Sequence, residues 1–267
     1  LDEKFDEIYL DKVMSLSLSP KLINKYKDLS FVYTPIHGTG GQLMPKIFDK
    51  AGFKNFHTVE EQMVTDGNFP TVISPNPEEH EAMTMAIAKA EAINADVVLA
   101  TDPDADRVGV AVKDDNGKFI LLNGNQTACI LTYYILTRWN ELGRLTGKEF
   151  IVKTIVTTDL LTKIANKFNV KTYEVLTGFK YIADKILNSP DEKFICGGEE
   201  SYGFLVGDFV RDKDAIISCF MLAEATAWAA EQGKTLYQLL KDIYKEFGVY
   251  REKLVSLTKK VSAASKR

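Results

Sequence analysis

The stretch DVVLATDPDADRVGVAV, residues 96–112, places an acidic loop between two apolar runs that are typical of β-strands. Alternate residues of an extended chain point the same way, so Asp102, Asp104 and Asp106 are expected to converge on one point. A hard divalent cation such as Mg²⁺, which prefers oxygen ligands, would remove their mutual repulsion. The adjacent Arg107 adds a fixed positive charge that suits a phosphate. The stretch therefore favours a metal and phosphate site in a loop between two strands.

This loop has two other interpretations. Aspartate is common in turns and Pro103 supports one, so a polar turn without ligand stays open for the acidic run alone. An EF-hand requires glycine at position six of its loop and glutamate at position twelve. Counted from Asp102, those positions hold Arg107 and Lys113. The EF-hand interpretation is therefore excluded.

The composition narrows the class of protein. The chain has 267 residues, 45% hydrophobic and 26% charged, which is enough apolar length for two ordinary domains. Its net charge is −4 and its basic residues are spread out, so we expect no nucleic-acid and no membrane partner. Three widely spaced cysteines without a C-x-x-C pair argue against disulfides and zinc. Without a signal-peptide pattern or a membrane-spanning stretch, a cytoplasmic location is expected.

The first half of the chain alternates strand and helix patterns up to the acidic loop. A β-turn-α unit over 31–52 has glycines at Gly38, Gly40 and Gly41, a spacing that fits neither G-x-G-x-x-G nor the P-loop. The glycines either allow a tight turn from the strand to the helix or let backbone N–H groups receive an anion, and we favour the tight turn. His37 in this turn is expected to be a hydrogen-bonding spacer. The acidic loop then lies at the carboxyl end of a strand, the edge where open α/β sheets place their sites.

A hairpin and a second α/β pattern follow the acidic loop. Asp-Asn-Gly at 115–117 predicts the hairpin turn, and Asn123 with Gly124 marks a boundary. The second half contains an expected strand over 150–158 and a long, mostly apolar helix over 214–232. These alternating patterns predict a second α/β unit.

Polar sites interrupt this second half at three places: 177–180, 197–203 and 211–214. In the second of them, glycines let the backbone approach a ligand, and Glu199 and Ser201 are expected to face one way and to accept and donate hydrogen bonds. Each site alone is typical of a turn or a surface ion cluster. Together they favour a polyhydroxyl ligand that carries a phosphate.

With these motifs, the sequence resembles the α-D-phosphohexomutase family, the phosphoglucomutases and phosphomannomutases. The resemblance covers nearly the whole chain in the family's order, through YTPIHGTGG, FPTVISPNPEE, DPDADRVGVAV, VKTIVTTDL, TGFKYI, GGEESYGF and RDKDA. The combination of DPDADR with GGEESYG is specific. In this family four α/β domains surround one cleft and supply, in order, a phosphoserine, a metal loop, a sugar-binding loop and a phosphate-binding loop.

The resemblance implies a role for each matching residue. It implies Mg²⁺ ligands at Asp102, Asp104 and Asp106, with Arg107 beside the phosphoserine. It implies contacts to the sugar hydroxyls, in either orientation of the hexose, from Glu199 and Ser201. Further substrate contacts are implied at Thr177, Gly178 and Lys213, and an acid/base or charge-stabilising role at Lys153.

The sequence lacks two motifs of the family pattern. Nothing matches the T-A-S-H-N-P-like serine loop of the first domain or the phosphate-binding loop of the fourth. We therefore expect two consecutive α/β domains with mixed sheets, 1–122 with the metal loop and 123–253 with the sugar loop, and the start of a linker at 254–267. Without the phosphoserine there is no phosphoryl donor and no fourth metal ligand, so this piece alone is expected to be inactive and to hold Mg²⁺ weakly.

The sequence is compatible with three functions. The resemblance implies a mutase that interconverts hexose 1-phosphate and 6-phosphate through a phosphoserine and a bisphosphate intermediate. A non-catalytic module that binds sugar phosphates is the first alternative, and a phosphatase with an aspartate nucleophile is the second. The sequence leaves glucose, mannose and pentose phosphates open, although GGEESYG resembles the phosphoglucomutase and phosphopentomutase branches more than the phosphomannomutase branch.

Overall fold

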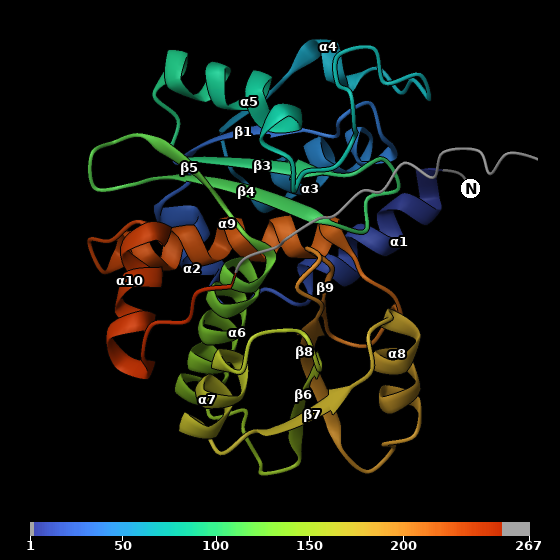
Figure 1. Ribbon diagram of the computed structural model, residues 1–267, viewed down its shortest axis with the longest axis vertical. Helices are drawn as coiled ribbons and strands as arrows, with labels where there is room; N and C mark the ends of the chain where they lie inside the picture. The colour runs from blue at the N-terminus through green and yellow to red at the C-terminus, as the bar shows by residue number, and fades with distance from the viewer. Residues whose placement is uncertain (1–2, 253–267) are drawn as a thin grey trace, which may run out of the picture.

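A computed structural model describes residues 3–252 of the chain. It contains two mixed sheets, drawn one above the other in Figure 1 with the long helix α9 (Ala215–Glu231) between them. The predicted α/β class with mixed sheets is thereby confirmed. The division of the chain at residue 122 stays a prediction, and the expected linker at 254–267 lies outside the described residues.

The first sheet has the order β2-β1-β3-β4-β5. Its strands are β1 (Ser30–Thr34), β2 (Asn55–Thr58), β3 (Val97–Thr101), β4 (Val108–Lys113) and β5 (Phe119–Leu122). β1, β2 and β3 are parallel, whereas β3, β4 and β5 are antiparallel neighbours. The carboxyl ends of the three parallel strands therefore lie at one edge, and the acidic loop between β3 and β4 begins there.

Alternate residues of this sheet enter two separate cores, as the period of a strand requires. Val32 and Val98 face the core formed with α5 (His80–Ile93). Tyr33 and Leu99 face the larger core on the other side of the sheet. That side is covered by α1 (Glu3–Met14), α2 (Pro20–Lys25), α3 (Leu43–Ala51) and α9. The short elements η1 (Thr39–Gly41) and α4 (Glu60–Met63) complete the first half.

The second sheet has the order β7-β6-β8-β9. Its strands are β6 (Glu149–Thr154), β7 (Lys171–Val175), β8 (Lys193–Gly198) and β9 (Phe204–Val206), of which only β9 is antiparallel. The helices of this half are α6 (Gly124–Glu141), α7 (Leu160–Lys167), α8 (Phe179–Leu187), α9 and α10 (Leu236–Phe247). The predicted strand over 150–158 is too long, because β6 ends at Thr154. The chain turns there, and the Thr157 N–H donates to the Thr154 carbonyl.

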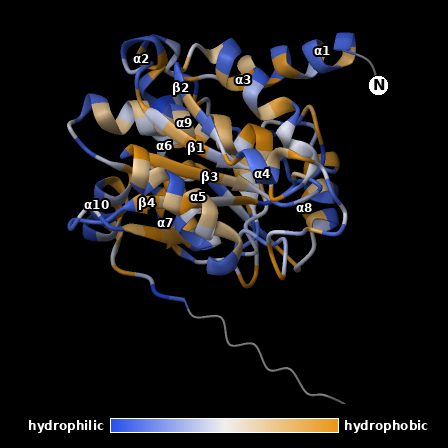
Figure 2. Cartoon of the chain, turned by 90° about the horizontal axis from the view of Figure 1, so that it is seen from above, coloured by the Kyte–Doolittle hydropathy of each residue, from blue (hydrophilic) through white to orange (hydrophobic). Residues whose placement is uncertain are grey.

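Helix α9 joins the two halves. Every residue from Ala215 to Ala229 is buried, because α9 packs against β3 and β4 above and against β9 and α6 below. Its Glu224 carboxylate accepts the backbone N–H groups of Leu18 and Ser19 at 2.9 and 2.8 Å, which satisfies a buried charge. Figure 2 shows the same pattern from above: the central strands are largely apolar, whereas α1 and α2 at the periphery carry many hydrophilic residues.

Among residues 3–252, no helix combines the length and the apolar character needed to cross a lipid bilayer.

Candidate functional site

The acidic loop brings its three carboxylates together. The carboxylate oxygens of Asp102, Asp104 and Asp106 lie within 4.8 Å of one another, as predicted. The expected reason was wrong, because the loop is a turn and not an extended chain. Ala105 adopts a left-handed conformation with φ of 59° and donates its N–H to the Asp102 carbonyl at 3.0 Å. The Asp102 side chain closes the turn by accepting the N–H groups of Asp106 and Arg107 at 3.0 and 2.9 Å.

The electrostatics of the loop favour a cation. The pKa of Asp102 is raised to about 7, first by burial and then by the neighbouring charges of Asp106 and Asp104, against the lowering effect of the backbone N–H groups that it accepts. Two side-chain cations offset part of this repulsion. The Arg107 Nε lies 3.7 Å from Asp102 Oδ2, and the Lys213 Nζ lies 2.9 Å from Asp106 Oδ2. Three converging carboxylates form a donor set of hard oxygens, which fits Mg²⁺.

The glycine-rich turn, residues 38–41, packs against the acidic loop. A Cβ atom at Gly38 would lie 2.3 Å from the Pro103 Cα, so only glycine allows this close approach. The Thr39 N–H donates to the Pro103 carbonyl at 2.8 Å. The buried His37 ring bonds the Val64 carbonyl and the Thr71 hydroxyl at 2.9 and 2.8 Å. The turn connects β1 to η1 and α3, as predicted, and the His37 ring makes the hydrogen bonds expected of a spacer.

A second loop, residues 199–203 between β8 and β9, contacts the acidic loop directly. Gly203 and Arg107 form an antiparallel bridge, and Val108 donates its N–H to the Tyr202 carbonyl at 3.0 Å. The Lys213 side chain lies directly against Gly203, because a Cβ atom at Gly203 would be 2.2 Å from the Lys213 Cδ. Loops from the two sheets therefore form one continuous polar region.

Within the second loop, the Glu199 side chain is bonded to the protein, whereas Ser201 lines a cavity. The Glu199 carboxylate is 7% exposed and accepts the Gly178 N–H at 2.8 Å, which joins two of the predicted substrate-binding positions. Ser201 lines a cavity of about 710 Å³ together with Glu78. Thr177 is exposed beside Gly178. Contact of these side chains with a sugar stays a prediction.

Glu200 is a functional candidate that sequence reasoning missed. Its Oε2 accepts the hydroxyls of Thr154 and Thr157 at 3.2 and 3.1 Å, and its N–H donates to the Thr157 hydroxyl at 3.1 Å. A Cβ atom at Gly124 would lie 2.0 Å from the Glu200 carbonyl oxygen. Glu200 thus fixes the second loop to the turn after β6. The sequence signal for Glu200 is its place beside Glu199, the residue for which a sugar contact is predicted.

Glu78 was missed as well. Its Oε1 lies 3.7 Å from Arg107 Nη1. Burial raises the pKa of Glu78, and the charges of Glu200 and Glu79 act in the same direction against the opposing effect of Arg107. Glu78 therefore links the cavity beside Ser201 to the arginine of the acidic loop.

Lys153 lies in an ion cluster at the carboxyl end of β6. It is 1% exposed, and its Nζ lies 2.5 Å from Glu174 Oε2 and 3.0 Å from Asp159 Oδ1. It also donates to the Thr157 carbonyl at 3.1 Å. Thr157 connects Lys153 to the second loop through Glu200. A role for Lys153 at the transferring phosphate stays a prediction.

Two family models together match most of the chain. Residues 7–117 match the model described as phosphoglucomutase/phosphomannomutase, alpha/beta/alpha domain II, and residues 123–247 match the corresponding domain III. The chain belongs to the phosphohexomutase family. These two matches show that the chain contains domains II and III of the family.

Relatives show how much of a phosphohexomutase is present. A phosphoglucomutase of Staphylococcus haemolyticus is 40% identical over 230 residues, which cover 86% of this chain and 41% of that protein. A putative phosphomannomutase from Thermus thermophilus has a similar structure, with a TM-score of 0.74 and 23% identity over 93% of this chain and 52% of its own. An Aspergillus fumigatus N-acetylphosphoglucosamine mutase, solved with GlcNAc-6P and magnesium, has a TM-score of 0.55 and 14% identity over 87% and 53%. The chain thus spans about half the length of the proteins it matches, and the two structures establish the fold.

Proposed function

We propose that this chain supplies the metal-binding and sugar-binding loops of a phosphohexomutase that interconverts hexose 1-phosphate and hexose 6-phosphate. The observation that carries the proposal is the direct contact between the acidic loop and residues 199–203, through the bridge of Arg107 with Gly203. A triad of carboxylates therefore lies next to a loop rich in hydroxyl-binding groups, as the transfer of a phosphoryl group on a sugar requires.

Asp102, Asp104 and Asp106 would hold the metal. Mg²⁺ bound there would neutralise charge on the transferring phosphoryl group, the electrostatic work on which this chemistry mostly depends. Support for magnesium comes from the oxygen donors of the triad and from the fungal relative that was solved with this ion. Arg107 and Lys213, which flank the triad, would hold the phosphate by charge-assisted hydrogen bonds.

The second loop would bind the sugar. The Glu199 carboxylate, held in place by the Gly178 N–H, accepts hydrogen bonds from sugar hydroxyls, and Ser201 both donates and accepts them. Thr177 supplies a further hydroxyl. Lys153 would hold or deliver a proton at the transferring oxygen, or stabilise its charge. Glucose, mannose and N-acetylglucosamine phosphates all remain candidate substrates, since the relatives carry all three names.

The phosphoryl donor would come from outside these two units. Because the chain spans about half of each relative, we propose that a phosphoserine loop and a phosphate-binding loop belong to a longer protein that contains this chain. The 267 residues alone should then turn over no hexose phosphate. A cytoplasmic location, where hexose phosphates are used, is part of the same proposal.

The test is a coupled assay on the longer protein with a panel of glucose, mannose, N-acetylglucosamine and pentose 1-phosphates. The proposal expects turnover of at least one hexose 1-phosphate and loss of that turnover in Asp104→Asn. Normal turnover by the 267-residue chain alone would contradict it. If no substrate turns over while the chain still binds hexose 6-phosphate, the function is that of a sugar-phosphate binding module. An aspartyl-phosphate adduct detected by mass spectrometry would instead identify a phosphatase.

A further inference from the structure

The N-terminal end of helix α9 is bonded to the acidic loop. The Lys213 ammonium, just before the helix, lies 2.9 Å from the Asp106 carboxylate. The Ala215 N–H, in the first turn of the helix where backbone donors lack partners within the helix, donates to the Ala105 carbonyl at 3.0 Å. Ala105 is the left-handed residue between two of the predicted metal ligands. The start of α9 therefore contacts both the backbone and a side chain of the acidic loop.

Asp214 fixes the position of this helix end. Its side chain caps α9 by accepting the Ile217 N–H at 2.9 Å, and its own N–H donates to the Phe204 carbonyl of β9 at 3.0 Å. A negative charge also interacts favourably with the positive end of the helix dipole. These contacts determine where α9 begins, and hence where Lys213 and Ala215 lie.

Tyr9 of α1 holds the Asp214 carboxylate. The Tyr9 hydroxyl lies 2.9 Å from Asp214 Oδ1 and 2.8 Å from Asp214 Oδ2. Burial and the Asp214 charge raise the pKa of Tyr9, so the hydroxyl stays protonated and remains a donor. The Tyr9 ring packs edge-on against Phe209, in the segment that leads to Asp214. A tyrosine 205 residues earlier in the sequence thus orients the cap of α9.

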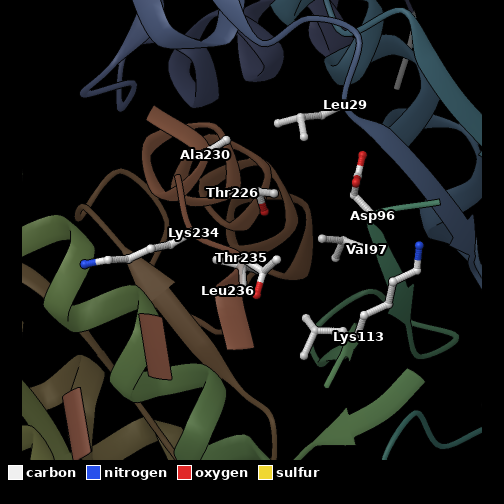
Figure 3. Close-up of a pocket in the computed structure, with 10 residues that line it drawn as sticks. Leu29, Asp96, Val97, Lys113, Thr226, Ala230, Lys234, Thr235 and Leu236 are labelled. Atoms are coloured by element: carbon white, nitrogen blue, oxygen red, sulfur yellow. The ribbon is translucent and has the colours of Figure 1, made fainter. Parts of the chain in front are cut away.

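The C-terminal part of α9 meets the first sheet differently. A pocket of about 150 Å³ is lined there by Val97 of β3 and by Thr226 and Ala230 of α9 (Figure 3). The Thr226 hydroxyl donates to the Leu222 carbonyl of its own helix at 2.7 Å. This part of α9 is therefore less tightly packed against the first sheet than the N-terminal end, where the helix is bonded to the acidic loop.

We propose that Tyr9 and Asp214 are positioning residues for the metal ligands of the acidic loop. Tyr9 orients Asp214, which fixes the first turn of α9. The Ala215 N–H then holds the Ala105 carbonyl and, with it, the spacing of the carboxylates on either side. A site whose supporting contacts are loosened binds its ligand more weakly. The proposal rests on the proposed metal role of the acidic loop, and the first of its two tests needs no metal.

The first test is the amide hydrogen exchange of Ala215 in the 267-residue chain without metal. Tyr9→Phe keeps the ring but removes the donor to Asp214, so the Ala215 amide is expected to exchange about tenfold faster. Tyr134→Phe is the matched control, because the buried Tyr134 donates its hydroxyl to Ser19 Oγ at 3.0 Å. The control is expected to leave this exchange rate unchanged. An unchanged rate in Tyr9→Phe, or an equal increase in both variants, overturns the proposal.

The second test is a Mg²⁺ titration of the same variants, followed by the amide signals of Asp106 and Arg107. Tyr9→Phe is expected to raise the Mg²⁺ dissociation constant at least about threefold, whereas Tyr134→Phe leaves it unchanged. Asp214→Asn, which keeps an acceptor for the helix cap, is expected to bind Mg²⁺ more tightly than Asp214→Ala.

The outcomes of this titration separate the positioning role from the proposed metal site. If the wild type binds Mg²⁺ and Tyr9→Phe binds it equally well, the positioning role is wrong and the metal site stands. If the wild type shows no Mg²⁺ shifts, the proposed metal site is wrong, and with it the role of Tyr9 and Asp214 at that site. If Asp214→Ala does not fold, the two tyrosine variants decide.

Discussion

The two loops that form the candidate site differ in how well their charges are satisfied. In the acidic loop, three carboxylates converge within 4.8 Å and the pKa of Asp102 is raised to about 7 by burial and by its neighbours. In the second loop, Glu199 and Glu200 each accept hydrogen bonds from fixed donors of the protein. The first loop needs a cation to relieve its repulsion, whereas the second is organised before any ligand arrives. Removal of a carboxylate should therefore have opposite effects on stability in the two loops.

The largest effect is expected in the second loop. Glu200→Ala removes the carboxylate that accepts the buried hydroxyls of Thr154 and Thr157. Since the two hydroxyls lie 2.7 Å apart, only one of them can then donate to the other, and the loss should lower the free energy of unfolding by about 2 kcal/mol. Urea unfolding measures this loss. Glu79→Ala removes an exposed carboxylate and is expected to stay within about 0.5 kcal/mol of the wild type. Equal stability of the two variants would show that Glu200 does not organise the loop.

A smaller loss is expected when the acidic loop loses a cation. Lys213→Met keeps the stem that covers Gly203 but removes the ammonium 2.9 Å from Asp106. Because the remaining carboxylates repel one another more strongly, the metal-free chain should lose about 1 kcal/mol of stability at low salt. Lys148→Met, at an exposed lysine, is the control. If added salt does not reduce the difference between these variants, the effect of Lys213 is not electrostatic.

The smallest effect has the opposite sign. Asp104→Asn removes one of the repelling carboxylates at an exposed position, so the metal-free chain should gain about 0.5 kcal/mol. Asp191→Asn, at an exposed aspartate outside the loop, should leave stability unchanged. Thermal unfolding in buffer with a chelator compares the two. A destabilised Asp104→Asn would mean that the carboxylates do not repel one another in the folded chain.

The sequence predicted those features that depend on short-range pattern. The alternation of Val32 with Tyr33 and of Val98 with Leu99 between two cores follows directly from strand periodicity. The convergence of the acidic loop was also predictable, and Pro103 indicates a turn, but the backbone conformation that brings the carboxylates together was not predictable. The left-handed turn at Ala105 has no glycine or asparagine to indicate it, and it depends on the backbone hydrogen bonds that Asp102 accepts.

The features that could not be predicted depend on partners distant in the sequence. Glu200 is held by threonines more than forty residues earlier, 43 and 46 positions away. The sequence predicts an uninterrupted strand through those threonines, because Thr and Val favour strands. No local residue indicates that the strand ends at Thr154. The ion pair of Lys213 with Asp106 joins the two halves of the chain. It could not be predicted, because it depends on how the two sheets pack in space.

The most direct test of the account is a Mg²⁺ titration of the 267-residue chain, followed by the backbone amide signals of residues 102–107. A pH of 8 keeps most of the Asp102 carboxylate ionised, because its pKa is about 7. Saturable shifts at the amides of Asp106 and Arg107, which bond Asp102, are predicted at millimolar Mg²⁺, with loss of these shifts in Asp104→Asn. Unchanged amide signals in the wild type, or equal shifts in Asp104→Asn, would contradict a metal site in the acidic loop.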